Sequence, residues 1–261
     1  MDGNRGPEVA LRRAVIPALD TDDLHKALQW VELLSGEGPR IFKVGLQLFS
    51  RFGPKAVEEV KKRGGGVFLD LKFHDIPNTV SRAARAAVAM GVDMFNVHAL
   101  GGKAMVASAV DSALDESQRR GLTPPLVLAV TLLTSLDDED LAELGLKGKA
   151  ASWVMRWARL AMKAGAQGLV ASALEAEALR KKFGSRIVLV CPGIRGTIHG
   201  QRDDQKRTSG AKKALWKGAN FVVMGRSLWE AEDPVALVRE IEENEPRETP
   251  SRDHGLPKKG G

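Results

Sequence analysis

The sequence predicts a (β/α)8 barrel, an α/β fold formed here as a single domain. Short apolar runs alternate with amphipathic stretches eight times along the chain. The amphipathic stretches repeat their apolar residues with the period of an α-helix. The chain has 261 residues, a length at which such barrels commonly form one domain.

The predicted strands are short runs rich in Val, Ile, Leu and Phe. Runs of this length with β-branched residues favour strands over helices. In chain order they span residues 15–19, 41–44, 67–71, 94–97, 126–132, 168–171, 187–190 and 221–224.

Helical periodicity is clearest in residues 22–34, 54–63, 79–90 and 152–164, and several of these segments begin with Asp, Ser or Thr and end near Gly. Two stretches interrupt the alternation. Residues 136–149 predict an extra short helix. Residues 195–209, after the seventh strand, form a Gly-, Arg- and Asp-rich loop that we expect to act as a lid.

We expect the barrel to occupy residues 14–243, with a tail at each end. Residues 1–13 carry charges and Gly-Pro but no apolar segment, so they resemble neither a secretory signal nor a membrane anchor. Residues 244–261 are rich in Glu, Pro, Arg, Lys and Gly, which predicts a disordered tail.

Composition narrows the class of protein. Hydrophobic residues make up 43% of the chain and charged residues 28%, as in a soluble globular protein. The net charge of +6 suits an anionic ligand, but the basic residues are scattered among acidic ones, so we do not expect a nucleic-acid surface. A single cysteine, Cys191, excludes an intrachain disulfide and fits a cytoplasmic location.

The segment 68–79 is the strongest candidate for an active site. Side chains on a strand alternate between faces, so Asp70 and Lys72 are predicted on one face, and Asp75 follows in the next loop. Burying such charges is costly unless each neutralises the next, so these clusters often mark chemistry. A purely structural ion pair is the alternative for Asp70 and Lys72.

Polar residues also stand at or near the predicted carboxyl ends of the other strands, where barrel enzymes place their active sites. They are Asp20, Lys43, Thr134, the segment from Pro192 to Arg195, and Gly225 with Arg226. Phosphate in this fold commonly binds between the loops after the seventh and eighth strands. Gly225 allows a close backbone approach there, and Arg226 offers charged donors. His98, near the fourth strand's end, lacks the further ligands of a metal centre.

The decapeptide from Asp70 to Thr79, Asp-Leu-Lys-Phe-His-Asp-Ile-Pro-Asn-Thr, resembles the signature of the orotidine 5'-phosphate decarboxylase family. Other segments resemble family blocks in family order, so the resemblance extends over residues 15–237. These segments are 18–20, 42–45, 96–99, 129–135, 192–195, 204–207 and 223–226.

The resemblance implies decarboxylation of orotidine 5'-phosphate (OMP) to UMP in de novo pyrimidine synthesis, by a cytoplasmic homodimer without a metal or cofactor. It also implies the residue roles. Lys72 stabilises the C6 carbanion and donates the proton, in a charged network with Lys43, Asp70 and Asp75. Asp75 and Thr79 reach the partner subunit's site.

The remaining implied contacts hold the substrate. Asp20 and Lys43 bind ribose hydroxyls and Thr134 binds the pyrimidine. The phosphate contacts come from Arg195, Gln205, Gly225 and Arg226, and Pro192 borders them. Gln201 is the alternative to Gln205, which we choose because it stands in Asp-Gln-Lys-Arg.

Two other functions remain open. A metal-dependent sugar-phosphate decarboxylase or aldolase shares an Asp-x-Lys-x-x-Asp motif, but it places an acidic metal ligand near Lys43, where a lysine repels Mg²⁺. A catalytically silent nucleotide-binding barrel is disfavoured, since every expected catalytic position carries a competent residue.

Overall fold

The structure is a computed structural model that describes residues 14–37, 40–193 and 204–243, with the backbone alone for residues 204–209. The predicted tails, residues 1–13 and 244–261, lie outside the described residues. So does most of the predicted lid, residues 195–203. Its last part was predicted as loop, but residues 204–209 form the first turns of the helix Asp204–Trp216.

Eight parallel strands form the barrel, in the order β1-β8-β7-β6-β5-β4-β3-β2, and the single-domain (β/α)8 prediction is confirmed. A bridge between Ala18 and Lys43 connects the two end strands and completes the circle. The strands are β1 (Val15–Pro17), β2 (Ile41–Gly45), β3 (Gly66–Phe73), β4 (Met94–His98), β5 (Leu126–Val130), β6 (Gly168–Val170), β7 (Val188–Cys191) and β8 (Phe221–Met224).

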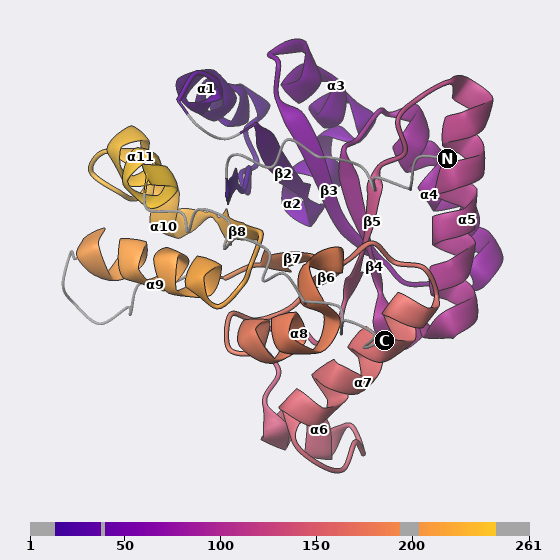
Figure 1. Cartoon of the computed structure of the whole chain (residues 1–261). Coiled ribbons are helices and arrows are strands. Elements are labelled where there is room, and N and C mark those ends of the chain that lie inside the picture. Colours follow the sequence, from indigo (N-terminus) through magenta and orange to yellow (C-terminus); the bar gives the residue numbers. More distant parts are fainter. Residues whose placement is uncertain (1–13, 38–39, 194–203, 244–261) are drawn as a thin grey trace, which may run out of the picture.

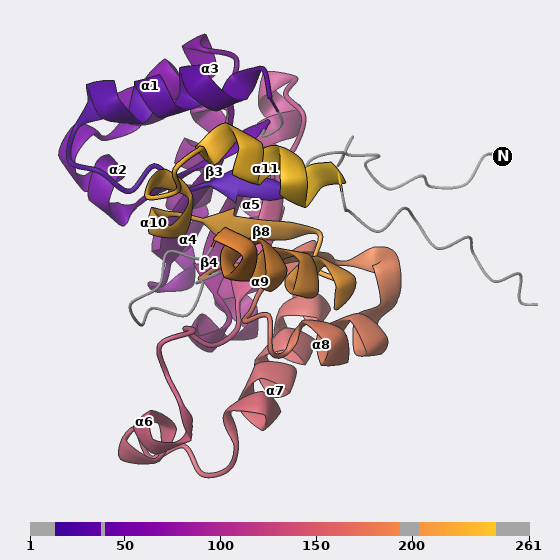
Figure 2. The ribbon, with the colours of Figure 1, turned by 90° about the vertical axis from the view of Figure 1, so that its left-hand side faces the viewer.

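Helices surround the barrel, and Figures 1 and 2 show them on its outside from two directions. They are α1 (Leu24–Ser35), α2 (Leu46–Phe52), α3 (Pro54–Lys62), α4 (Pro77–Ala89), α5 (Gly102–Arg120), α6 (Asp138–Glu143), α7 (Ala150–Lys163), α8 (Ala176–Phe183), α9 (Asp204–Trp216), α10 (Arg226–Trp229) and α11 (Pro234–Glu243). Two 3-10 turns join them, η1 (Ala99–Gly101) and η2 (Gly184–Arg186).

The core has two layers because successive strand residues face opposite sides of the sheet. On β8, Phe221 and Val223 point into the barrel, whereas Val222 and Met224 pack against the outer helices. The inner layer also contains Phe68, which is 1% exposed. Burying a side chain of this size contributes about 1.5–3 kcal/mol. The barrel interior is therefore a packed core, and a ligand must bind at one of its ends.

The outer helices bury one face each, as their sequence period predicts. In α7 the buried residues are Val154, Trp157, Ala158 and Ala161, which lie on one side of the helix at spacings of three and four. The predicted extra helix is confirmed as α6. Asp137 begins α6 by accepting from the backbone of Glu139 and Asp140, a capping box. Among the described residues, no helix is both long and apolar enough to cross a membrane.

The strand boundaries differ from the prediction at two informative places. Residues 18–19 were predicted to continue the first strand, but the regular pairing of β1 with β8 ends at Pro17, and Ala18 forms an isolated bridge to Lys43 of β2. The Ala18 N–H donates to Met224 O at 2.8 Å on β8, and the Leu19 N–H donates to Lys43 O at 2.9 Å on β2. β3 runs on to Phe73, beyond the predicted end at residue 71, because Phe73 still pairs with Val97. An apolar run in the sequence indicates which residues are buried. The ends of a strand depend instead on which backbone groups find hydrogen-bond partners.

Candidate active site

The predicted polar residues gather at one end of the barrel because all eight strands run in the same direction. Asp20 follows β1, Lys43 lies in β2, and Asp70 and Lys72 lie in β3. Thr134, Pro192 and Gly225 follow β5, β7 and β8 in turn; these three are positioned by loops at the same end.

Four charged side chains form a chain of alternating sign across β1, β2 and β3. Lys43 Nζ lies 2.8 Å from Asp20 Oδ1 and 3.5 Å from Asp70 Oδ2, and Lys72 Nζ lies 2.7 Å from Asp70 Oδ1. The side chains of Lys43 and Asp70 are only 11% and 12% exposed, whereas that of Asp20 is 43% exposed at the rim. Each buried charge therefore has a partner of opposite sign.

The Asp70 carboxylate is the centre of this chain. Burial by itself raises the pKa of the Asp70 carboxyl group. The positive charges of Lys43 and Lys72 lower this pKa, and hydrogen bonds from Lys72 and Asn96 lower it further. The pKa of Asp70 is therefore held below its ordinary value. The group is an anion at neutral pH, fixed between two ammonium groups.

Lys72 has an unusual backbone conformation. Its φ is +51°, and it is the one non-glycine residue with a positive φ among those described. This left-handed conformation costs about 1–2 kcal/mol for a residue with a Cβ. Such strain persists only where the surroundings hold the residue, and it is concentrated at functional sites.

β3 carries a bulge where it passes the site, but its side chains still alternate between the two faces. The pairing with β4 shifts register between Leu69 and Phe73, yet Leu69, Leu71 and Phe73 all pack with the outer core. Asp70 and Lys72 therefore share the inner face, as strand alternation predicts, and their side chains lie in contact. The bulge and the positive φ of Lys72 are local departures from regular strand geometry within this shared face.

Asn96 on β4 belongs to the same cluster, and the sequence reasoning gave it no role. Its Nδ2 donates to Asp70 Oδ1 at 2.7 Å, and its Oδ1 accepts from the backbone N–H of Lys72 at 2.8 Å. The residue is 1% exposed. Its sequence signal was an amide within an otherwise apolar strand.

His98 ends β4 near the same cluster. Its ring centroid is 5.3 Å from that of His74. Burial, followed by the neighbouring His74 and Lys72, lowers the pKa of His98 to about 4, while Asp70 acts in the opposite sense. The imidazole is therefore neutral at pH 7. Among the described residues, no group of three or more His, Cys, Asp and Glu side chains is arranged to hold a metal ion.

Asp75 and Thr79 lie apart from the four-charge chain. Asp75 is exposed, and its carboxylate accepts from the backbone N–H of Ile76 at 2.7 Å. Within the described part of this chain it forms no ion pair with Lys72. Thr79 is exposed in the first turn of α4, and Ile76 between them is 66% exposed.

A cavity of about 650 Å³ opens near the ends of β5, β6 and β7. Thr134 and Pro192 line it, so the structure brings these two predicted residues together. Lys213 and Lys217 of α9 also line it and contribute positive charge. Gly193 follows Pro192 with a φ of +71°, a left-handed conformation that glycine adopts without steric cost.

Gly225 and Arg226 lie where β8 turns into α10. A Cβ on Gly225 would stand 3.7 Å from Asp20 Oδ2, so this turn borders the charged cluster. The indole of Trp229 stacks on Trp30 of α1, with ring centroids 4.2 Å apart, and its Nε1 donates to Ala18 O at 2.7 Å. These contacts hold α10, and thus Arg226, against β1 and α1.

Two predicted phosphate residues have no described side chain. Arg195 and the alternative Gln201 lie outside the described residues. Gln205 lies in the first turn of α9, where the structure gives only the backbone. Their expected contacts with phosphate stay predictions.

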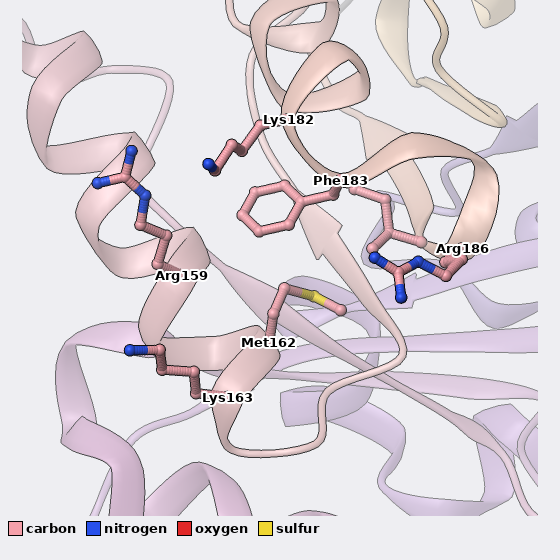
Figure 3. Close-up of a pocket in the computed structure, with 7 residues that line it drawn as sticks. Arg159, Met162, Lys163, Lys182, Phe183 and Arg186 are labelled. Atoms are coloured by element: carbon pink, nitrogen blue, oxygen red, sulfur yellow. The ribbon is translucent and has the colours of Figure 1, made fainter.

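Another cavity, of about 520 Å³, lies between the ends of α7 and α8 that precede β6 and β7, and none of the predicted site residues lines it. Figure 3 shows basic side chains around an apolar centre. The basic residues are Arg159, Lys163, Lys182 and Arg186, and the apolar ones include Met162 and Phe183.

Comparisons with known proteins find one family across nearly the whole chain. The model of the "Orotidine 5'-phosphate decarboxylase / HUMPS family" matches residues 13–241. The chain is 50% identical over 213 residues to the orotidine 5'-phosphate decarboxylase of Syntrophus aciditrophicus (strain SB), covering 82% of this chain and 84% of that protein. It is 48% identical over 228 residues to the enzyme of the same name from Moorella thermoacetica, covering 87% and 90%.

A solved structure is similar over the same length. The crystal structure of orotidine 5'-phosphate decarboxylase from Lactobacillus acidophilus matches with a TM-score of 0.76 and 35% sequence identity. The match covers 90% of this chain and 100% of that one.

Proposed function

Because the chain belongs to the orotidine 5'-phosphate decarboxylase / HUMPS family, we propose that it converts OMP to UMP and CO2 in de novo pyrimidine synthesis, and that it needs no cofactor. The observation that carries the proposal is the alternating chain Asp20, Lys43, Asp70 and Lys72 at the mouth of the barrel. At the end of this chain, the Lys72 ammonium is the fixed cation that would face the substrate.

Electrostatic stabilisation suits this reaction. When the bond between C6 and the carboxylate breaks, CO2 leaves and the electron pair stays on C6 in the plane of the ring. That pair cannot delocalise into the ring π system, so a positive charge beside it is the direct means of stabilisation. The Lys72 ammonium then gives its proton to C6, which yields UMP, and water reprotonates the amine.

The neighbours of Lys72 would keep its ammonium group charged and oriented toward the substrate. The salt bridge of 2.7 Å to Asp70 supports this role, because an adjacent carboxylate favours the ammonium form. Lys43 would neutralise the other Asp70 oxygen and, with Asp20, bind the ribose hydroxyls. The exposed position of Asp20 at the rim supports a contact with substrate.

Substrate binding would extend from the cluster toward β7 and β8. Thr134 and Pro192 would border the pyrimidine and phosphate, supported by their shared cavity. Gly225 and Arg226, with Arg195 and Gln205, would bind the phosphate. Binding energy from this remote group would help the segment between β7 and α9 to close over the site, and so would contribute to the rate as well as to affinity.

We infer a homodimer in which Asp75 and Thr79 complete the partner's site. Two features support it. Both residues are exposed near the active-site end instead of joining the cluster of their own chain. Ile76, between them, leaves a large apolar side chain 66% exposed, which favours burial against a partner. A cytoplasmic location accords with this role and with the single cysteine.

The metal-dependent sugar-phosphate reaction is less suited to this site. The Lys43 ammonium lies between Asp20 and Asp70 and occupies the oxygen ligands that a divalent cation would need. A silent binding barrel is disfavoured, since the candidate proton donor and its anionic partner are both present in contact.

The test is the ultraviolet absorbance change when the purified protein is mixed with OMP, with and without EDTA. We expect rapid conversion to UMP that EDTA does not alter. EDTA-sensitive turnover would support the metal-dependent alternative, and absence of turnover would support a silent barrel.

Lys72→Ala tests the proposed proton donor. The variant should bind UMP but decarboxylate OMP at least about 1,000-fold more slowly, because both the cation and the proton are lost. Lys55→Ala, which removes an exposed lysine on α3, is the matched control and should keep full activity. Near-normal turnover by Lys72→Ala would contradict the proposed role.

A further inference from the structure

We propose that Asn96 is a positioning residue that holds Asp70 and Lys72 in their reactive arrangement. The inference rests on the proposed function, since it concerns how that site is assembled. It also adds to the site a buried residue whose side chain bonds to the Asp70 carboxylate and to the Lys72 backbone.

The first observation is the bulge between β3 and β4. Leu69 pairs with Phe95 and Phe73 pairs with Val97, so the segment from Asp70 to Lys72 lies opposite Asn96 alone. The backbone N–H of Lys72 donates to the side-chain Oδ1 of Asn96 at 2.8 Å. A side chain thus provides the acceptor where the regular ladder is interrupted.

The second observation is the other end of the same amide. Its Nδ2 donates to Asp70 Oδ1 at 2.7 Å, and that oxygen also accepts from Lys72 Nζ at 2.7 Å. One amide therefore bonds to the backbone of the proton donor and to the carboxylate that orients its ammonium group. With Asn96 1% exposed, bulk water cannot replace these two bonds.

The third observation is the conformation that these bonds support. Lys72 has a φ of +51°, and a residue with a Cβ keeps this conformation only where several contacts hold it. The Lys72 N–H bond to Asn96 fixes the backbone at that residue. Without it, we expect Lys72 to relax and its ammonium group to move away from C6. A displacement of about 1 Å can lower a rate by roughly 100-fold.

Asn220 provides a matched control within the same fold. Its Oδ1 also accepts from a backbone N–H of the neighbouring strand, that of Leu189, at 2.8 Å. It lies before β8, at the opposite end of the barrel from Lys72, and also binds Arg180. A variant of Asn220 therefore loses similar structural bonds without touching the proposed reaction.

Asn96→Ala removes both bonds. We expect kcat for OMP to fall by about 100-fold with KM changed less than about threefold, because the substrate contacts stay in place. Asn220→Ala should lower the melting temperature without lowering kcat. Equal effects of the two variants on kcat would overturn the proposal, because Asn96 would then act only through stability.

Asn96→Asp separates positioning from stability further. It keeps the acceptor for the Lys72 N–H but places a second carboxylate against Asp70. Two adjacent carboxylates share a proton as the pH falls, and the protonated one can again donate to its neighbour. The ratio of the variant's kcat to the wild-type kcat should therefore rise as the pH is lowered. A ratio independent of pH would count against the proposal.

The charged groups that bear on this titration come from three strands. Lys43 on β2 and Lys72 on β3 contact Asp70, and His98 on β4, with His74 beyond it, lies near the cluster. On β5, the residue opposite Asn96 is the apolar Leu128. Expressing each rate relative to the wild type removes the titrations that both proteins share.

The same experiment distinguishes failure of the inference from failure of the proposed function. Wild-type protein that does not convert OMP refutes the function, whatever the variants do. Active wild-type protein with Asn96 variants that match the Asn220 control refutes the positioning role alone.

Discussion

At the scale of single residues, the site depends on four neighbouring charges of alternating sign, each of which neutralises the next. Lys43 and Asp70 are nearly buried, so each depends on its partner to remain charged. Removing one partner of a buried pair commonly costs about 3–5 kcal/mol, because the other charge is left uncompensated. The residues proposed for catalysis therefore also contribute to stability.

Gly45 is a residue whose lack of a side chain makes room for this cluster. A Cβ at Gly45 would stand 2.6 Å from Lys43 Nζ and 3.0 Å from Asp20 Oδ1. In Gly45→Ala we expect the flexible lysine end to move and the ion pair with Asp20 to open, so that KM for OMP rises about tenfold while the protein stays folded. Steady-state kinetics and circular dichroism measure the two effects.

Gly36→Ala is the control for Gly45→Ala, since a Cβ there meets nothing within 4 Å. It should leave both KM and the spectrum unchanged. An unaltered KM in Gly45→Ala would mean that the Asp20–Lys43 pair takes no part in binding.

His98 makes stability depend on pH. Its pKa is about 4 in the folded protein and near 6.5 when unfolded, so between these values the unfolded chain binds a proton that the native one does not. Stability should therefore fall as the pH drops from about 6.5 toward 4. After allowance for solvent screening at this half-buried site, we expect a loss of about 1–2 kcal/mol.

Urea unfolding at pH 7 and pH 4.5 measures this loss. His98→Gln should lose less stability over that interval than the wild type. His25→Gln, at an exposed position on α1, should behave like the wild type. Asp70, whose pKa is lowered, contributes acid sensitivity to all three proteins. Identical losses in His98→Gln and wild type would exclude His98 as a source of the effect.

At the scale of elements, short segments outside the barrel hold the functional turns. The four-residue helix α10 carries Arg226, and it is too short to be stable by itself. It is held by the stacked pair of Trp30 and Trp229, whose planes are only 2° apart, and by the bond from the Trp229 indole to Ala18. Contacts between elements thus supply the order that local helix formation cannot.

Trp229→Phe tests this support. The aromatic ring can still stack, but the bond of 2.7 Å to Ala18 O is lost. We expect KM for OMP to rise about three- to tenfold with little change in kcat, since Arg226 would be held less firmly. Isothermal calorimetry with UMP should show the same weakening.

Trp153→Phe is the matched control for Trp229→Phe. The Trp153 Nε1 donates to Lys147 O at 3.1 Å on the outside of the barrel, so this variant loses a similar bond far from β8. If both substitutions change KM equally, α10 is not held by the Ala18 contact.

At the scale of the whole molecule, the barrel brings residues that are far apart in the sequence to one end. Asp20 and Arg226 are separated by more than two hundred positions, yet both lie beside the turn at Gly225. Asp75 and Thr79 stand outside this arrangement within one chain. A second copy of the chain is the proposed element that makes use of them.

Mixing inactive subunits tests the shared site. Lys72→Ala and Asp75→Ala should each be inactive alone. A heterodimer of the two should regain activity, because one of its two sites contains neither substitution. Randomly mixed subunits should approach a quarter of the wild-type activity, measured after joint refolding with OMP as substrate. No recovery in a mixture shown by mass spectrometry to contain heterodimers would contradict the sharing of Asp75.

The sequence by itself determined the fold and the family. Alternating apolar runs and amphipathic stretches predicted the barrel, because burial on the two sides of a strand and on one side of a helix leaves a local pattern. The motif from Asp70 to Thr79 indicated the family that the comparisons confirm. Polar residues at strand ends indicated which positions would meet.

Only the tertiary structure decided how those residues are held. The bulge in β3, the positive φ of Lys72 and the two bonds of Asn96 depend on β4, and the hold on α10 depends on α1 and β1. Such features have no local pattern, because a hydrogen bond between strands depends on the register that the whole barrel imposes. The types of residue in the site were therefore visible in the sequence, while their geometry was set by contacts between distant segments.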